Sequence, residues 1–367
     1  MPAAIPSFEV SGSPYEIGHE LGRRGAAGFR DRVRRLERFR ALQRDWGGSD
    51  RLRQIEACAR AALPRYVAEI EGIADGAEAP FADIFLWNCR GDFPGGGDQA
   101  GHADPGCTSV MIAGDGRPNV IAHNEDDDAL LDGACFWVTV RPRDGLSFTS
   151  FYSPGLLPGH TFGFNERGLV QTINHVRPFD QKVGVPRGIV CRAVLGSATL
   201  DEALAVLCRD DRAGGFHHNL GQVGDRRLLS VEAPASGCAA REIDGIGVHA
   251  NHLLHPDFAR LRQEVAPSSA RRQTRAEELA AEVLRVRDPL MVLGDDDGDG
   301  LPICRKGTYD TDPGFTLATA VFEIEAQNLA WRVHAHPGES PVHSGQLTVS
   351  GPEHRRAASA TGAGGGR

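Results

Sequence analysis

The sequence predicts an α+β protein or a layered αββα domain, rather than a chain of alternating strand–helix–strand units. Three observations support this fold class. Residues 15–90 have helical periodicity, and the chain from Cys107 onward consists of short apolar runs separated by turns. Further helical blocks then interrupt these runs. At 367 residues the chain can form one large domain or two ordinary ones.

The first 90 residues predict helices in the stretches "YEIGHELGRRGAAGFRDRVRRLERFRALQ", "RLRQIEACARAALPRYVAEIEGIADGA" and "FADIFLWNCRGDF". In the arginine-rich part, four apolar residues fall at helical spacing: Val33, Leu36, Phe39 and Leu42. We therefore expect a packed helix that exposes its arginines. A basic helix on a membrane surface is the less favoured interpretation.

The segment 93–106, "FPGGGDQAGHADPG", predicts an exposed flexible loop. Hairpins are expected next in "CTSVMIAGDGRPNVIAHNED" and "CFWVTVRPRDGLSFTSFYS", with further strands in "HTFGFNERGLVQTINHV". A helical block, capped at Thr199 or Asp201, precedes strands in "HHNLGQVGDRRLLSVEA" and "AAREIDGIGVHANHLLH". The chain then predicts a helix in "SSARRQTRAEELAAEVLRV", a closing hairpin, and a disordered tail over 351–367.

Composition excludes several classes of protein. The net charge of −9 means that a nucleic-acid binder would need a local basic face. No apolar run approaches the roughly 18 residues of a membrane span, and the N-terminus does not resemble a signal peptide. The eight cysteines are scattered without a C-x-x-C pair, which indicates neither a disulfide framework nor a zinc cluster. We expect a cytoplasmic protein with no nucleic-acid or membrane partner.

Cys107 has unusual surroundings in the motif "PGCTS". A free cysteine is most often a small buried hydrophobic residue. Here Gly106 leaves the preceding carbonyl sterically open, so the thiol could attack it in an N→S shift. Hydrolysis would then free the α-amino group of Cys107, whose ordinary pKa is about 7.7–8.0. That group could act as the general base for its own thiol, without a catalytic histidine.

Polar side chains follow three apolar runs and are candidates for the site. The stretch "VIAHNEDDD" contains His123, Asn124 and Asp126, and it reads either as an acidic turn or metal loop or as the source of a catalytic carboxylate. Asn174 with His175 and Asn251 with His252 each end another apolar run. Neutral amides of this kind can stabilise an oxyanion, although Asn and His also commonly end strands and cap turns.

Six motifs in register resemble the cysteine-type N-terminal-nucleophile hydrolases of the penicillin (isopenicillin N) acyltransferase family. They are "FEVSGSPYEIGHELG", "PGCTSVMI", "AHNEDDD", "GHTFGFNERGLVQTINHV", "PRGIVCRAVL" and "HANHLLHP". The resemblance extends from about Phe8 to His336. Within the family, the sequence is most similar to the branch that hydrolyses β-alanyl amides of biogenic amines, such as β-alanyl-dopamine and carcinine.

The resemblance implies a four-layer αββα sandwich that cleaves itself between Gly106 and Cys107. Residues 1–106 would form the small subunit and 107–350 the catalytic one, with 351–367 as the tail. By position, Cys107 is the nucleophile, Asp126 orients the α-amino group and Asn251 donates to the oxyanion. The remaining candidate contacts to the oxyanion or substrate are Asn174, His175, Asn124, His123 and Arg305.

One family feature is missing from this sequence. The acyltransferases place an arginine where Pro313 stands, although Arg305 matches an earlier one. Any cationic help for cleavage or for an acidic substrate must therefore come from elsewhere or be absent. This departure slightly favours the amide-hydrolase branch over the acyltransferases.

The acidic stretch "GDDDGDGLPICRK" has Asp295, Asp297 and Asp299 at EF-hand-like spacing. Lys306 stands where a bidentate glutamate belongs, so an acidic loop is the preferred interpretation and a calcium site the lesser one.

The sequence thus predicts a self-activated amidohydrolase that acts on a small-molecule amide with no metal and no cofactor. Its own cleaved N-terminal segment would be its partner, and a homo-oligomer is left open. The alternatives are an acyltransferase that moves an acyl group from a thioester or amide donor to an amine, and an uncleaved, non-catalytic protein of the same fold. A papain-like thiol protease is less favoured, because Cys107 leads a strand instead of a helix.

Overall fold

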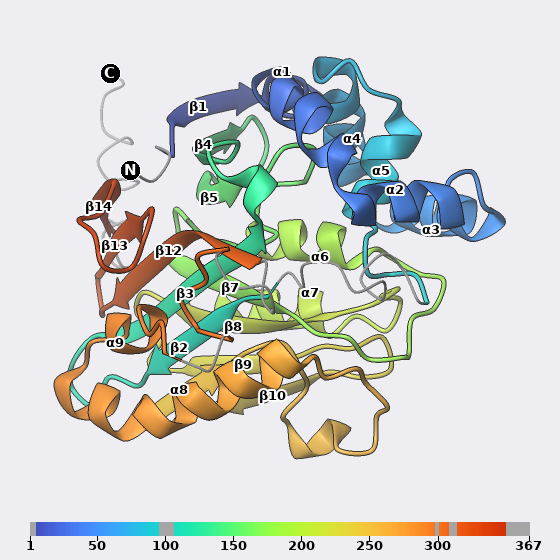
Figure 1. Ribbon diagram of the computed structural model, residues 1–367. Helices are drawn as coiled ribbons and strands as arrows, with labels where there is room; N and C mark the ends of the chain where they lie inside the picture. Colours follow the sequence, from blue (N-terminus) through green and yellow to red (C-terminus); the bar gives the residue numbers. More distant parts are fainter. Residues whose placement is uncertain (1–4, 95–105, 298–300, 308–313, 350–367) are drawn as a thin grey trace, which may run out of the picture.

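Two β-sheets face each other with helices outside them, in a computed structural model that describes residues 5–94, 106–297, 301–307 and 314–349 (Figure 1). One sheet has eight strands in the order β1-β4-β5-β6-β7-β8-β9-β10. The other has six, in the order β11-β2-β3-β12-β13-β14. The predicted αββα layering is therefore confirmed.

The helices divide unequally between the two outer layers. On the side of the eight-stranded sheet lie α1 (Pro14–Asp31), α2 (Glu37–Trp46), α3 (Asp50–Ala62), α4 (Pro64–Gly76), α5 (Phe81–Asn88), α6 (Arg187–Val194) and α7 (Leu200–Leu207). The six-stranded sheet is covered by α8 (Pro267–Val286) and α9 (Leu290–Leu293). Short 3₁₀ helices are found at Val33–Arg35, Ala129–Leu131 and Pro256–Phe258.

The strands confirm the predicted hairpins. The eight-stranded sheet contains β1 (Ser7–Gly12), β4 (Phe136–Pro142), β5 (Phe148–Tyr152), β6 (Phe162–Asn165), β7 (Leu169–His175), β8 (Phe216–Gln222), β9 (Leu228–Glu232) and β10 (Ala239–Glu242). The six-stranded sheet contains β2 (Thr108–Ile112), β3 (Asn119–Asp128), β11 (Ile246–His249), β12 (Gly314–Ile324), β13 (Asn328–His334) and β14 (His343–Thr348). The sequence did not predict β1, which pairs in parallel with β4, or β14 at the opposite sheet's edge.

Close helix packing anchors the N-terminal segment. Helix α1 begins with a capping box, in which Ser13 accepts from the Glu16 backbone and Glu16 accepts from the Ser13 backbone. A Cβ added at Gly18 would lie 1.9 Å from the Glu69 carbonyl oxygen, and one added at Gly76 would lie 1.9 Å from the His19 carbonyl oxygen. Only glycine allows α1 and α4 to approach so closely.

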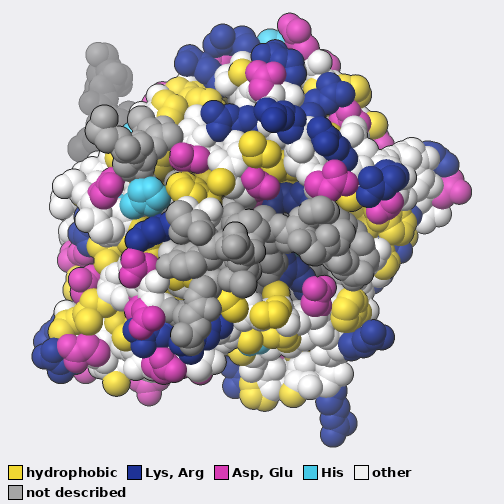
Figure 2. All heavy atoms as spheres, viewed as in Figure 1, with side chains coloured by type: hydrophobic (Ala, Val, Ile, Leu, Met, Phe, Trp, Pro, Cys, Tyr) yellow, Lys and Arg dark blue, Asp and Glu magenta, His cyan; other side chains and the backbone are white. Residues whose placement is uncertain are grey.

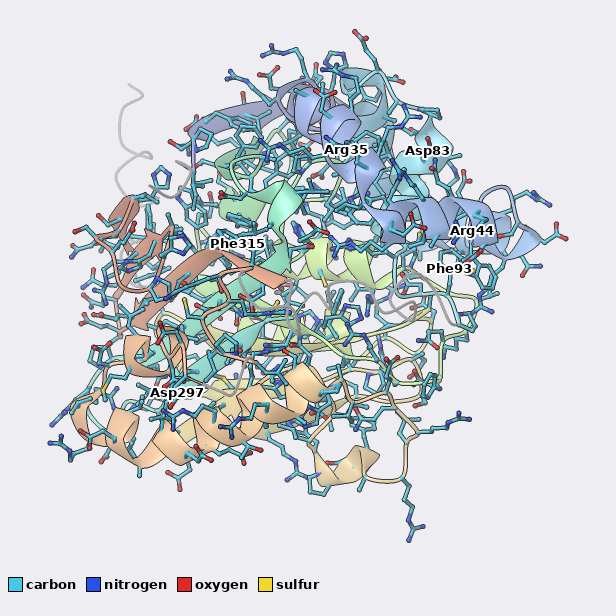
Figure 3. The ribbon with its side chains drawn as sticks, in the orientation of Figure 1. Arg35, Arg44, Asp83, Phe93, Asp297 and Phe315 are labelled. Carbon is cyan, nitrogen blue, oxygen red and sulfur yellow. A yellow bond between two sulfur atoms is a disulfide. The ribbon has the colours of Figure 1, made fainter. Side chains whose placement is uncertain are left out.

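The arginine-rich helices expose most of their charge, as predicted. Val33, Leu36, Phe39 and Leu42 are all buried. Lys and Arg side chains gather over these helices in Figure 2, and Figure 3 shows Arg35 and Arg44 on the outer side of this layer. Arg38 is the exception, because it is buried and forms an ion pair with Asp127 of β3.

The alternation of β3 decides which of its side chains approach the eight-stranded sheet. Ile121 packs in the main core, whereas Val120 and Ala122 belong to the cluster beneath α8 and α9. Because side chains alternate along a strand, His123 and the two odd-numbered residues that follow it share the face of Ile121. The even-numbered residues face the layer of α8 and α9.

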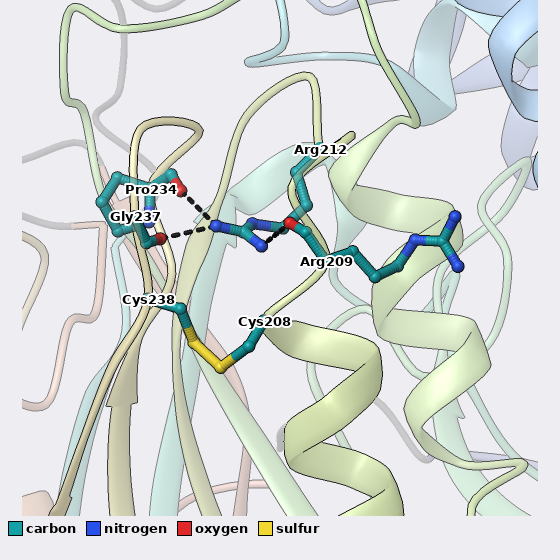
Figure 4. The surroundings of a disulfide bond; sticks show 6 residues. All are labelled: Cys208, Arg209, Arg212, Pro234, Gly237 and Cys238. Carbon is teal, nitrogen blue, oxygen red and sulfur yellow. Dashed lines mark hydrogen bonds between the residues drawn. A yellow bond between two sulfur atoms is a disulfide. The ribbon is translucent and has the colours of Figure 1, made fainter.

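A disulfide joins Cys208, at the end of α7, to Cys238, before β10 (Figure 4). The interpretation that no disulfide is indicated was wrong, because partners 30 residues apart leave no spacing signal. Beside the disulfide, Arg212 donates to the carbonyl oxygens of Pro234 and Gly237 and so joins the same two segments. Disulfides persist mainly in oxidising compartments, so the cysteine pattern no longer supports the expected cytoplasmic location.

Within the described residues, no helix is both long and apolar enough to cross a membrane. The described carboxylates of the acidic loop after α9 form ion pairs. Asp295 lies 2.8 Å from Arg275, and Asp296 lies 2.7 Å from Lys306. Asp297 lies in the loop beside α8 (Figure 3). Asp299 and the predicted tail lie outside the described residues, as does most of the predicted loop over 93–106.

The disulfide predicts a measurable loss of stability when it is removed. Replacing Cys208 and Cys238 together by alanine should lower the free energy of unfolding by about 2–4 kcal/mol, because the loop of the unfolded chain is no longer closed. Urea unfolding of the oxidised and reduced protein measures the change. Cys58→Ser, at a half-buried free cysteine, is the control. Equal stability of the oxidised and reduced protein would contradict the pairing.

Candidate active site

The register of β2 and β3 places the Cys107 thiol beside a carboxylate. Thr108 pairs with Asn124, so the residue before Thr108 lies next to the residue after Asn124. The Cys107 Sγ donates to Glu125 Oε2 at 3.2 Å, and Thr161 donates to the same oxygen at 2.6 Å. Glu125 was not among the residues predicted for the site, although it lies within the motif "AHNEDDD".

Side-chain hydrogen bonds hold both of the peptide units that adjoin Cys107. Its N–H donates to Asn251 Oδ1 at 3.0 Å, and its carbonyl oxygen accepts from Arg272 Nη1 at 2.7 Å. Arg272 also donates to Asn251 Oδ1 at 2.7 Å and to Thr108 Oγ1 at 2.9 Å. A Cβ added at Gly106 would lie 2.4 Å from Arg272 Nη2, so this arrangement leaves no room for a side chain at Gly106.

Arg272 supplies a buried cation next to the expected cleavage site. It is fully buried on α8, 165 residues after Cys107 in the chain. Arg272 could not be predicted from the sequence, because α8 contains several arginines and no local pattern distinguishes this one. Pro313, near which the family's later arginine is expected, lies outside the described residues.

Asn251 is at Cys107, as the sequence predicted, and its orientation is defined by several contacts. Its Nδ2 donates to the His175 carbonyl oxygen at 3.0 Å, while its backbone N–H donates to Ser269 Oγ at 2.9 Å. In the uncleaved chain the oxygen of this amide therefore faces Cys107. Its role as an oxyanion donor stays a prediction.

Asp126 and Arg305 are neighbours on the other face of β3. Asp126 Oδ1 accepts from Thr316 Oγ1 at 2.7 Å, and its Oδ2 lies 4.0 Å from Arg305 Nη1. Thr316 Oγ1 also accepts from the Arg305 backbone at 2.9 Å. The Asp126 backbone is hydrogen-bonded to Cys107. The orienting role of the Asp126 carboxylate stays a prediction.

Asn124, Asn174 and His123 separate into two environments. Asn124 donates to the Leu293 carbonyl oxygen of α9 and accepts from Thr319, so its contacts are with the outer layer. Asn174 lies between the sheets, where its Oδ1 accepts from Ser109 at 2.8 Å. His123 belongs to the same buried network, and its ring nitrogen Nδ1 lies 2.8 Å from Ser109 Oγ.

A small pocket opens onto the thiol and is lined mainly by charged and polar side chains. Its described lining consists of Arg38, Arg90, Cys107, Glu125, Asp126, Asp127, His160, Ile173, His175, Arg187 and Phe216. Ile173 and Phe216 are the hydrocarbon side chains of this described lining. Arg187 lies 4.0 Å above the Phe216 ring and donates to the Gly215 carbonyl oxygen at 3.2 Å. His175, an expected site residue, lies in the wall of this pocket.

Burial sets the protonation states in this pocket. It raises the pKa of the Cys107 thiol well above its ordinary value, and the nearby carboxylates of Glu125 and Asp126 raise it further. Burial also acts to raise the pKa of Glu125, but contact with His123, together with His160 and the Thr161 hydroxyl, holds it below its ordinary value. Burial and the charge of Arg90 lower the pKa of His160 to about 4. At neutral pH the uncleaved site therefore pairs a protonated thiol with an ionised carboxylate.

Comparison with known proteins identifies relatives over nearly the whole chain. A β-alanyl-dopamine/carcinine hydrolase of Drosophila melanogaster is 24% identical over 93% of this chain and 95% of that protein. The 40 kDa form of an acyl-coenzyme A:6-aminopenicillanic-acid-acyltransferase of Emericella nidulans is 27% identical over 74% of this chain and 76% of that protein.

A solved structure is also similar to this chain. It is an orthologue of N-acylethanolamine-hydrolyzing acid amidase from Caenorhabditis elegans, with 14% identity and a TM-score of 0.43 over 59% of this chain and 92% of that one. The model of the family described as acyl-coenzyme A:6-aminopenicillanic acid acyl-transferase matches residues 112–337, well over half of the chain. The chain therefore belongs to this family, and it is an enzyme of amide hydrolysis or acyl transfer.

Proposed function

We propose that this protein is a cysteine amidohydrolase that activates itself by cleaving the Gly106–Cys107 bond and then hydrolyses a small N-acyl amide. The observation that supports this proposal is the position of Cys107. Its thiol is bonded to Glu125, while Asn251 and Arg272 hold the two peptide units that adjoin it. A buried structural cysteine would need none of these charged partners.

Self-cleavage needs a proton acceptor before the α-amino group exists, because the nitrogen of Cys107 is still an amide in the uncleaved chain. Glu125 is 3.2 Å from the sulfur and ionised at neutral pH, so it can take the thiol proton. The sulfur then attacks the Gly106 carbonyl carbon. When the C–N bond breaks, the nitrogen takes a proton and a thioester is left on Cys107.

Water hydrolyses this thioester, which releases the Gly106 carboxylate and leaves Cys107 with a free thiol and a free α-amino group. In turnover, the α-amino group takes the thiol proton, and the sulfur attacks the substrate carbonyl. The protonated amine then donates its proton to the leaving amine. Water finally hydrolyses the acyl-thioester and regenerates the enzyme.

The pocket supports a short, polar acyl group such as a β-alanyl group. Its described lining contains the carboxylates of Glu125, Asp126 and Asp127 and the guanidinium groups of Arg38, Arg90 and Arg187, but it offers hydrocarbon only at Ile173 and Phe216. The ammonium of a β-alanyl group would be attracted to these carboxylates, whereas a long alkyl chain would desolvate them without compensation. The Drosophila relative is named for a β-alanyl amide.

Acyl transfer is the second candidate, supported by the family description and by the Emericella relative. The two reactions share the acyl-thioester and differ only in the acceptor. Transfer requires that an amine reach the acyl-enzyme before water does.

Cleavage is the first testable consequence. The intact mass under denaturing conditions should show two chains, with the second beginning Cys-Thr-Ser-Val-Met. Cys107→Ala should remain a single, inactive chain because it lacks the nucleophile. Cys135→Ala is the matched control at another buried cysteine, and it should be cut as the wild type is. A cut, active Cys107→Ala protein would refute the proposal.

Glu125→Gln tests the proton acceptor by the pH dependence of self-cleavage. In the wild type the folded pKa of Glu125 is lowered, so the rate should be constant through neutral pH and fall only as acid protonates the carboxylate. The variant should cleave about 10²–10⁴-fold more slowly at neutral pH. Its rate should rise about tenfold per pH unit, because solvent must remove a thiol proton whose pKa is raised.

Asp126→Asn provides the comparison on the neighbouring carboxylate. Whatever its absolute rate of self-cleavage, this rate should stay constant through neutral pH, as it does in the wild type. If Asp126→Asn gains the tenfold slope and Glu125→Gln does not, the acceptor is Asp126.

Substrate preference is measured with paired amides of one amine. The kcat/KM for the β-alanyl amide should exceed that for the octanoyl amide, and Asp127→Asn should reduce this preference because one pocket carboxylate is lost. A preference for the octanoyl amide would contradict the assignment. Product ratios at saturating amine distinguish the two reactions, since purely hydrolytic turnover excludes the transferase.

A further inference from the structure

His123 has a buried ring nitrogen, Nε2, that lies beside the carboxylate next to Cys107. Ser109 Oγ donates its one hydrogen to Asn174 Oδ1 at 2.8 Å, so it can only accept from His123 Nδ1, 2.8 Å away. Nδ1 of His123 therefore carries a hydrogen, and Nε2 is the ring nitrogen that can offer its lone pair to a metal ion. Among the described residues this buried Nε2 has no hydrogen-bond partner.

A carboxylate oxygen of Glu125 lies close to this nitrogen. Nε2 of His123 lies 3.5 Å from Glu125 Oε2, which is also an acceptor and is itself 3.2 Å from Cys107 Sγ. The three atoms lie within 4.8 Å of one another, and all three residues are buried. A ring nitrogen, a carboxylate oxygen and a sulfur therefore lie close enough together to share one cation.

We propose that Cys107, His123 and Glu125 bind a zinc ion, a site that departs from the metal-free expectation of the sequence. Thiolate, imidazole and carboxylate are the ligands that zinc prefers in proteins, at separations set by tetrahedral geometry. Calcium and magnesium prefer shells of oxygen atoms, so the sulfur and the ring nitrogen disfavour them. A water molecule would be the fourth ligand, as in zinc sites with three protein ligands.

The surroundings have the form of an outer shell around a metal. Ser109 fixes the ring orientation of His123 through Nδ1, and Thr161 donates to Glu125 at 2.6 Å. Hydrogen bonds of this kind set the tautomer and direction of metal ligands, and losing one typically costs about 10–100-fold in affinity.

Zinc binding would silence the nucleophile reversibly. The ion displaces the thiol proton, which leaves to the buffer, and a zinc–sulfur bond forms with no change in oxidation state. The bound sulfur can attack neither Gly106 nor a substrate carbonyl. This inhibitory consequence rests on the proposed function, whereas the binding itself does not.

The test is a titration of the full-length protein with zinc chloride in the absence of any substrate, followed by calorimetry in two buffers of different ionisation enthalpy. One zinc per chain should bind with release of a proton. Cobalt(II) chloride should give a near-ultraviolet thiolate charge-transfer band. His123→Gln and Glu125→Gln should each weaken zinc binding by more than the roughly 10–100-fold of an outer-shell change.

Two control variants separate this site from other binding. His218→Gln removes another buried histidine, and Asp297→Asn removes an exposed carboxylate of the acidic loop; both should bind zinc as the wild type does. Circular dichroism checks that each variant is folded. The inference is overturned if the protein binds no zinc, or if Asp297→Asn loses the binding and His123→Gln keeps it.

The outcome also separates this inference from the proposed function. Zinc binding by a chain that never cleaves would leave the metal site standing and remove the enzyme mechanism. A cleaved, active enzyme that binds no zinc would leave the enzyme mechanism standing and remove the metal site.

Discussion

The antiparallel register between β2 and β3 is the constraint on which the candidate site depends. It pairs Thr108 with Asn124 and so sets Glu125 beside Cys107. Because side chains alternate along a strand, a slip of one residue would send Glu125 to the helical layer and bring Asn124 or Asp126 to the thiol. The apolar residues of the same two strands fix the register, since Met111 and Ile121 must enter the core between the sheets.

The second requirement is that the charges buried around Cys107 compensate one another. Arg272 is fully buried, yet it donates to the Cys107 carbonyl oxygen, Thr108 and the side-chain oxygen of Asn251. A buried guanidinium without such acceptors would be strongly unfavourable. The contacts that stabilise Arg272 are therefore the same contacts that fix the peptide units next to Cys107, so folding and the geometry of the site cannot be separated.

The sequence predicted the layers, the hairpins and the residues at both ends of the Cys107–Asn251 contact, because these follow from local texture and from motifs in register. It selected Asp126 and did not predict that Glu125 is the carboxylate beside the thiol. That choice depends on strand parity, which only the partner strand defines. Arg272 and the Cys208–Cys238 pair were missed for a related reason, since each depends on a contact between segments distant in the chain.

Burial of the Cys107 thiol both protects the sulfur and determines how it can be activated. The raised pKa of Cys107 keeps the sulfur protonated, and a protonated thiol is a poor nucleophile and a poor target for oxidants. Such a residue can react only if an acceptor lies within reach inside the same pocket. Glu125 is such an acceptor in the uncleaved chain, and its contacts with Thr161 and His123 keep it ionised despite its burial. After cleavage, the α-amino group would be a second acceptor on the same residue, with an ordinary pKa of about 7.7–8.0 that suits turnover near neutral pH. The two steps therefore place different demands on the base, and one site can meet both because the first step creates the base used in the second.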